Sequence, residues 1–278
     1  MLITLLTILI QMANAWTPKE VNGEIVTWKS TAVDFYINLD GYSGQLTDNE
    51  VENAIVNASK AWDAQEYQSA LEFAYQGTSK NQGADLSDGT HVVSFDQTWT
   101  HDPSLLAITH VWSNSNHEIV HFDIEINMED AYWTVNGDVN GHDLQNSLTH
   151  EFGHALGLEH SDDQEATMSA TTSMGETQKR NLNEDDIAGF VNLYPFSEGT
   201  ESGTNTDNSN TNSANAGNSS SGAVTNNDLA KPSNTGSGTG PVQLEKAGCQ
   251  NISLSHRPAS LWFLSCPLLF VFLRRSSQ

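Results

Sequence analysis

The sequence predicts a domain of the α/β or α+β class within residues 16–196. Two segments, Ala32–Leu39 and Glu118–Asn127, alternate between apolar and polar side chains, which is the two-residue period of a half-buried strand. Residues 48–65 instead repeat their apolar side chains at helical spacing, after a capping-box pattern at Thr47–Glu50. Strands and helices are therefore mixed along the chain, and no internal repeat is visible.

The remaining elements have signals of the same two kinds. Short apolar runs predict strands at His91–Phe95 and Leu106–Trp112. The turn-rich residues 136–141 precede a second expected helix, which runs from about His142 to Leu156.

The charge of the chain is concentrated on this domain. The 278 residues carry a formal charge of −24, and residues 16–196 hold 6 basic and 30 acidic side chains. A surface this acidic repels nucleic acid and anionic membrane faces, so we expect no nucleic-acid partner. The two cysteines, Cys249 and Cys266, follow the domain, which excludes a small disulfide scaffold.

Residues 1–15 resemble a secretory signal peptide. Met1–Ile10 is almost wholly apolar, and Ala13 and Ala15 are the small residues that a signal peptidase reads. The basic residue usual before the apolar run is missing, so a buried N-terminal strand stays open as an alternative. We expect cleavage before Trp16 and a secreted, extracellular protein.

The C-terminal region divides into a linker and a tail. Residues 197–247 are mostly Ser, Thr, Asn and Gly, a composition typical of a flexible linker. Within residues 248–278, Cys249 is followed by an apolar run at Leu261–Leu273 and by an arginine pair. This order resembles the sorting tails of bacterial surface proteins and predicts attachment to the cell surface or outer membrane of a bacterium. An uncut membrane anchor and an incidental tail stay open.

One segment carries the chemistry: His150-Glu151-Phe152-Gly153-His154-Ala155-Leu156-Gly157-Leu158-Glu159-His160. Residues four apart share a helix face, so His150 and His154 can present imidazole nitrogens to one metal ion. Gly157 can take the left-handed conformation that ends a helix, after which the chain can return His160 as a third ligand. Three neutral imidazoles suit Zn²⁺ and leave a fourth position open, as catalytic sites do. Glu151 lies beside them, where its carboxylate can act on a water molecule.

This motif resembles the zinc signature of the metzincin peptidases. Ser161 and the spacing to Met168 resemble the matrixin branch, the matrix-metalloproteinase-like family, in which the methionine forms a turn beneath the zinc. Leu106-Ala107 and His121-Phe122-Asp123 resemble its edge strand and the next strand, and residues 183–195 its closing helix. The resemblance covers about residues 25–196. It implies a mixed twisted sheet with an active-site helix and a C-terminal helix.

The resemblance also implies an activity. It predicts a monomeric zinc metalloendopeptidase with protein or peptide substrates, in which Glu151 is the catalytic base and His150, His154 and His160 hold one catalytic zinc. The substrate would pair with the edge strand at Leu106, Ala107 and Ile108, and residues 169–172 would form the wall of the specificity pocket. A zinc-binding module without turnover and a metal-independent surface protein stay open.

The sequence differs from the family pattern at several positions, so not every metal site of the family can be assigned to this chain. Ile108 stands where the family has a ligand of a second, structural zinc, so that ion is not expected, although His101 and His110 could improvise a site. Ile126 stands where an acidic ligand of a calcium site is expected, which leaves calcium binding open. No cysteine precedes the motif that could block the zinc, so we expect an enzyme that is active once folded and metal-loaded.

Overall fold

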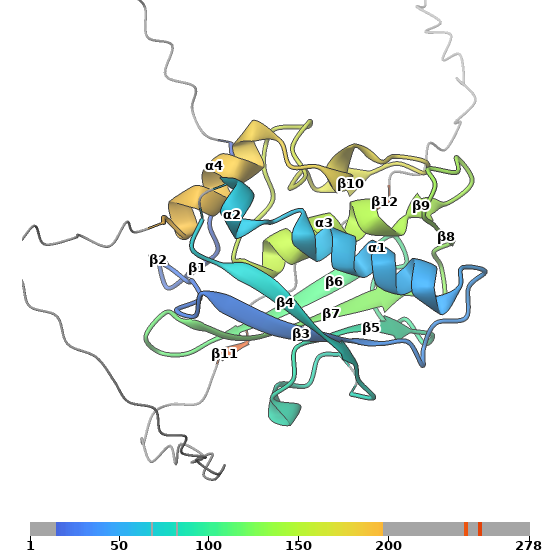
Figure 1. Cartoon of the computed structure of the whole chain (residues 1–278), viewed down its shortest axis with the longest axis horizontal. Coiled ribbons are helices and arrows are strands. Elements are labelled where there is room, and N and C mark those ends of the chain that lie inside the picture. Colours follow the sequence, from blue (N-terminus) through green and yellow to red (C-terminus); the bar gives the residue numbers. More distant parts are fainter. Residues whose placement is uncertain (1–14, 68, 82, 197–241, 244–249, 252–278) are drawn as a thin grey trace, which may run out of the picture.

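The computed structural model describes residues 15–67, 69–81, 83–196, 242–243 and 250–251 (Figure 1). The predicted signal peptide lies outside the described residues except for Ala15, and so do nearly all of the predicted linker and tail. Among the described residues, every helix is too short or too polar to cross a lipid bilayer.

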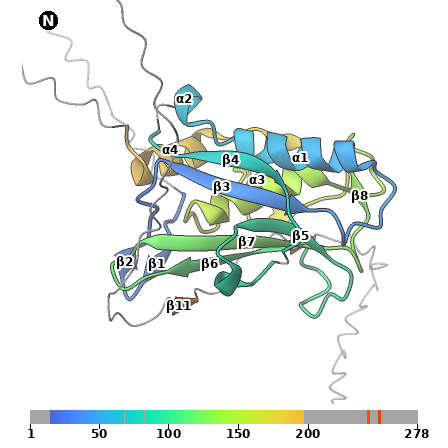
Figure 2. The same cartoon turned by 60° about the horizontal axis from the view of Figure 1, so that its bottom comes forward.

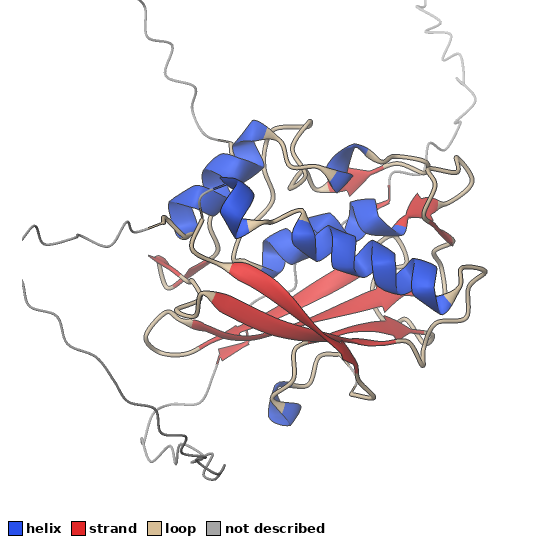
Figure 3. Cartoon of the chain, viewed as in Figure 1, coloured by secondary structure: helices blue, strands red, loops and turns tan. Residues whose placement is uncertain are grey.

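A twisted mixed sheet forms the centre of the domain (Figure 3). Its strand order is β11-β6-β7-β5-β3-β4. Strands β4, β3, β5 and β7 run parallel to one another. Strand β6 runs antiparallel to β7, and β11 runs antiparallel to β6. The strands of this sheet are β3 (Ala32–Asn38), β4 (Glu72–Thr78), β5 (Val92–Asp96), β6 (Ala107–Ser113), β7 (Ile119–Asn127) and β11 (Val242–Gln243).

Three two-stranded pairs complete the β-structure. They are β1 (Glu20–Val21) with β2 (Glu24–Ile25), β8 (Trp133–Thr134) with β9 (His142–Asp143), and β10 (Thr171–Thr172) with β12 (Gln250–Asn251). The last pair joins the segment after the motif to the far C-terminal region of the chain.

Two helices, α1 (Asp48–Lys60) and α3 (Leu144–Ala155), lie side by side over one face of the sheet (Figure 2). The alternating side chains Val33, Phe35 and Ile37 of β3 point into the core beneath them and are almost completely buried. The short α2 (Ala64–Tyr67) and the closing α4 (Glu184–Leu193) complete the helices. The predicted fold class is therefore confirmed, including the active-site helix and the C-terminal helix.

Two local predictions need correction. The expected helix over 48–65 breaks after Lys60, because the chain turns there to bury Trp62, whose indole N–H donates to the carbonyl of Thr149 at 2.9 Å. A side chain of Asp63 then accepts from the backbone N–H of Glu66 and begins α2. Strand β4 is not predicted by the sequence, because it lies at the sheet edge and its side chains show no clean burial alternation.

Candidate metal centre

The helix α3 carries the first two histidines of the motif. Its N-cap is Asp143, whose side chain accepts from the backbone N–H of Asn146 at 3.0 Å. His150 and His154 lie one turn apart and almost completely buried, and their Nε2 atoms are 3.0 Å from each other. The four-residue spacing therefore places both imidazoles on one face, as the sequence predicts.

A sharp turn brings the third histidine back to the first two. Gly157 has a φ of +94°, the left-handed conformation predicted for it, and its N–H donates to the carbonyl of His154 at 2.9 Å. The ring centroid of His160 lies 5.2 Å from that of His150 and 5.0 Å from that of His154. Within the described residues, these three side chains form the one group of His, Cys, Asp or Glu whose candidate ligand atoms all lie within 4.8 Å of each other.

The hydrogen bonds of the α3 histidines show which nitrogen atoms face the centre. Nδ1 of His150 contacts the carbonyl oxygen of Thr167 at 2.8 Å, and Nδ1 of His154 contacts that of Leu158 at 2.7 Å. A carbonyl oxygen only accepts, so both Nδ1 atoms carry the proton and both Nε2 atoms present lone pairs. Burial first, and the neighbouring cationic groups second, hold the pKa of both imidazoles well below 6.5, which keeps them neutral.

This donor set fits a zinc ion. Two lone pairs that face each other at 3.0 Å repel unless a cation lies between them. With Zn–N bonds of about 2.05 Å, two ligand atoms of a tetrahedral site are roughly 3.3 Å apart, close to the observed separation. The carbonyl groups on the Nδ1 side orient the rings, as partners of metal-bound histidines usually do.

Met168 lies directly beneath the motif helix. It is fully buried, and a Cβ atom added to Gly153 would come within 2.2 Å of its Sδ atom. Only a glycine between the two α3 histidines leaves room for this side chain. The structure therefore places Met168 where the resemblance expects the methionine turn.

A buried carboxylate binds this turn through hydrogen bonds. The sequence gives no reason to assign this carboxylate to the site. Both oxygens of Asp186, in the first turn of α4, accept backbone N–H groups: Oδ1 from Met168 at 2.9 Å and Oδ2 from Thr167 at 2.7 Å and from Asn183 at 2.8 Å. The capping-box pattern of Asn183 and Asp186 could have predicted the contact within α4. The contacts to the methionine turn depend on the tertiary fold.

The carboxylate of Glu151 is fully buried beside the histidines and has a partner on the sheet. The hydroxyl of Thr109 in β6 donates to Oε2 of Glu151 at 2.6 Å and lies 3.1 Å from its backbone carbonyl oxygen. Thr109 points toward the helix because it shares a sheet face with Ala107 and Val111. Sequence reasoning missed this residue, whose role depends on the packing of β6 against α3.

The predicted substrate strand and pocket wall flank this centre. Ala107 and Ile108 begin β6 and Leu106 directly precedes it, and all three side chains are almost completely buried. On the other side, the buried Lys179 donates from Nζ to the carbonyl oxygens of Ser169 at 2.5 Å and Thr171 at 2.8 Å. Lys179 thereby fixes the predicted pocket wall, a role that its sequence context does not reveal.

Comparison with known proteins agrees with this geometry. A model of the matrixin family, peptidase family M10, matches residues 27–195. The chain belongs to the matrixin family. It is 42% identical to human matrilysin over 74 residues, which are 27% of this chain and 26% of matrilysin. It is 26% identical to metalloendoproteinase 1-MMP of Arabidopsis thaliana over 172 residues, which are 60% of this chain and 44% of the plant protein. The matches thus span less than half the length of these relatives.

In this matrixin, the residues near the family's structural zinc position have protein partners. Nε2 of His121 lies 3.1 Å from Oδ2 of Asp123, which also accepts the backbone N–H of Asp85 at 3.0 Å. Farther along the same sheet face, the carboxylate of Glu125 lies 2.6 Å from Nε2 of His110 and 3.8 Å from Nε2 of His101. His101, His110 and His121 therefore each have a carboxylate partner from the protein.

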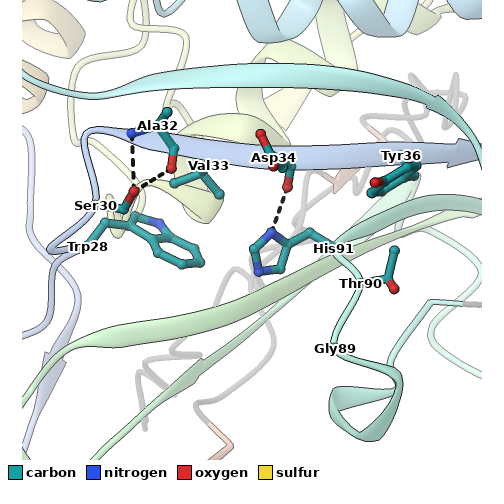
Figure 4. A pocket seen from close by; sticks show the side chains of 9 residues that line it. All are labelled: Trp28, Ser30, Ala32, Val33, Asp34, Tyr36, Gly89, Thr90 and His91. Atoms are coloured by element: carbon teal, nitrogen blue, oxygen red, sulfur yellow. Dashed lines mark hydrogen bonds between the residues drawn. The ribbon is translucent and has the colours of Figure 1, made fainter. Parts of the chain in front are cut away.

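A pocket of about 420 Å³ opens elsewhere on the matrixin domain (Figure 4). Its lining includes Trp28, Asp34 and His91 but none of the predicted site residues. Nδ1 of His91 donates to the carbonyl of Asp34 at 2.7 Å, and burial lowers the pKa of the imidazole. The ring of His91 also stacks on Phe122, so this histidine is part of the packing between β3 and β7.

Proposed function

We propose that this matrixin is a zinc metalloendopeptidase with one catalytic zinc. The observation that carries the proposal is the arrangement of His150, His154 and His160, whose candidate ligand atoms lie within 4.8 Å of one another. The imidazoles of His150 and His154 are also neutral and held by carbonyl groups on their far sides. Glu151 adjoins them and is the one carboxylate of the motif helix. Family membership supports the same activity.

Glu151 and Thr109 have separate roles in the proposed reaction. When bound, the zinc supplies a Lewis acid for the scissile carbonyl and lowers the pKa of a water molecule. Glu151 takes a proton from the attacking water and passes it to the nitrogen of the leaving amine. Thr109 donates to Oε2 of Glu151 and so limits the rotation of the carboxylate toward the reacting atoms.

The extended substrate would add a strand to the edge of β6 on which β11 pairs with Trp112 and Ser113. Backbone pairing at such an edge provides affinity without sequence selectivity, and pockets then select the side chains. We place this pairing at Leu106, Ala107 and Ile108, beside Thr109 and the base that it contacts. The wall at residues 169–172, held by Lys179, would select one substrate side chain.

We also propose the cellular setting that the sequence indicates. The protein would be secreted, act on protein or peptide substrates as a monomer, and stay attached to a bacterial surface through residues 248–278. Calcium binding stays open, and a second structural zinc is not expected. The proposals of secretion and surface attachment depend on the sequence patterns of residues 1–15 and 197–278, which lie almost wholly outside the described residues.

The decisive experiment compares zinc content and peptide cleavage in the same samples of the full chain and two variants. Glu151→Gln should retain zinc and lose cleavage by about 10²–10⁴-fold, because only the base is removed. Glu24→Gln, a control with the same charge change at an exposed position, should change neither quantity. A zinc-loaded wild-type chain that cleaves no member of a quenched peptide library would contradict the peptidase proposal and favour a binding module.

A further inference from the structure

Two short strands from the C-terminal region lie on either side of the candidate metal centre. Val242 and Gln243 (β11) pair antiparallel with Ser113 and Trp112 of β6. Gln250 and Asn251 (β12) pair parallel with β10, at Thr171 and Thr172. Figure 1 shows β11 and β12 at opposite ends of the domain, with the motif helix α3 between them.

Both pairings lie on elements proposed above for the substrate. β11 pairs with β6 four to seven residues beyond Leu106, Ala107 and Ile108, and β12 pairs with the pocket wall at Thr171 and Thr172. β6 is the edge strand on which an extended peptide would add, and Thr109, three residues before Trp112, contacts Glu151. β10 belongs to the wall that follows Met168, and the adjoining carbonyl of Thr167 holds His150. The two described ends of this segment therefore lie on elements that flank the centre.

Direction and length agree with a path from β11 to β12. Because β11 runs antiparallel to β6, the chain passes Gln243 in the direction of Thr109 and the metal centre. The six residues 244–249 lie outside the described residues, and an extended chain advances about 3.3 Å per residue. Seven such steps from Gln243 to Gln250 therefore span at most about 23 Å.

We propose that the C-terminal segment that carries β11 and β12 occupies the substrate groove of its own domain and keeps the enzyme in a self-blocked state. The inference rests on the proposed peptidase function and names the occupant of the edge of β6. It also replaces the expectation that the enzyme is active as soon as it is folded and metal-loaded: activity would require displacement or removal of this segment.

The tether determines how strong the block is. The 45 residues 197–241 join the domain to the segment, and their sequence predicts a flexible linker, which would give an effective concentration of about 1 mM. A segment with a dissociation constant of about 0.1 mM would then leave about one molecule in ten open. Cutting the tether and diluting the protein to nanomolar concentration should therefore raise the cleavage rate about 10-fold.

The test uses the full chain with a recognition sequence for a site-specific protease in place of residues 205–212. Zinc content, peptide cleavage and amide hydrogen exchange are measured before and after the cut. We expect the rate to rise about 10-fold at constant zinc content. Exchange at residues 107–113 and 169–172 should accelerate at the same time. A synthetic peptide of residues 240–253 should then raise KM without changing kcat, whereas a scrambled peptide should not.

Proline variants control for effects of the cut itself. The uncut double variant V242P/Q250P, which removes two backbone N–H groups from the segment, should already cleave at the rate of the cut protein. Asn215→Pro, in the tether, should leave the uncut rate unchanged. Equal rates and equal exchange before and after the cut would overturn the self-block, and so would inhibition by the peptide without a rise in KM. Accelerated exchange without any cleavage, at full zinc content, would instead contradict the peptidase function and leave the occupancy of the groove supported.

Discussion

Replacing Asp186 by Asn tests whether the closing helix α4 holds the metal centre in place. The carboxylate accepts three buried backbone N–H groups, two of them from the methionine turn. Burial raises the pKa of this carboxyl, and the three hydrogen bonds oppose that rise. Because both oxygens accept N–H groups, the geometry favours the ionised form.

An asparagine has one acceptor oxygen and cannot satisfy this arrangement. With its oxygen at the Oδ2 position, the amide NH₂ would face the N–H of Met168, and in the flipped orientation Thr167 and Asn183 would both lose their acceptor. One buried donor left without an acceptor costs about 1–3 kcal/mol, and weaker neutral hydrogen bonds add to this. We therefore expect Asp186→Asn to lower the free energy of unfolding by about 2–4 kcal/mol.

Urea unfolding at pH 7 measures this loss, with Glu184→Gln as the control. Glu184 lies in the same first turn of α4 and carries the same charge, but its side chain is exposed, so its replacement should stay within about 0.5 kcal/mol of the wild type. Because the carbonyl of Thr167 orients His150, the variant should also bind zinc about 10–100-fold more weakly. Equal stability and zinc affinity of the two variants would refute the role assigned to Asp186.

Three further predictions test the packing, the base and the histidines. Gly153→Ala should lower the melting temperature, because a Cβ atom 2.2 Å from Sδ of Met168 overpacks the core by about 1–3 kcal/mol. Thr109→Val should lower kcat about 3–10-fold by removing the donor to Glu151, with KM and zinc content unchanged, whereas Thr109→Ser should retain kcat. The pKa of both α3 histidines is lower in the folded protein than the 6.5 of an ordinary imidazole. Below that pH the unfolded chain binds more protons, so the free energy of unfolding of the metal-free protein should fall as the pH drops from about 7 to 5. Urea unfolding with a chelator present measures this, and a flat profile would contradict it.

The parts of the site that the sequence could predict are those encoded by local spacing. A four-residue interval on a helix puts His150 and His154 on one face whatever the rest of the fold does. Gly157 could be assigned to a left-handed turn because few other residues adopt that conformation. Strands β3 and β7 could likewise be predicted from the alternation of apolar and polar side chains, since each strand has one face toward the core and one away from it.

The supporting residues could not be read in this way, because their partners are distant in the sequence. Thr109 and Glu151 are separated by 42 residues, and Asp186 lies 18 residues after Met168. The break after Lys60 has a similar origin: helical periodicity continues through Trp62, and the contacts that favour the turn are tertiary, from its indole to Thr149 and to Phe190. Each of these residues is also explained by its own strand, helix or turn, so the sequence alone provides no reason to assign it a role in the site or in the helix break.

The contacts around the candidate metal centre also show where the matrixin domain ends. The hydroxyl of Tyr194, just after α4, donates to the carbonyl of Leu156 and accepts the backbone N–H of Trp28 at 3.2 Å. Leu156 directly precedes Gly157, so this buried tyrosine supports the turn that returns His160 to the centre. Removing Tyr194 would therefore disturb a metal ligand that is far from it in the sequence. A cut within residues 197–241 lies beyond this anchor, so it should release the C-terminal segment and leave the ligand geometry intact.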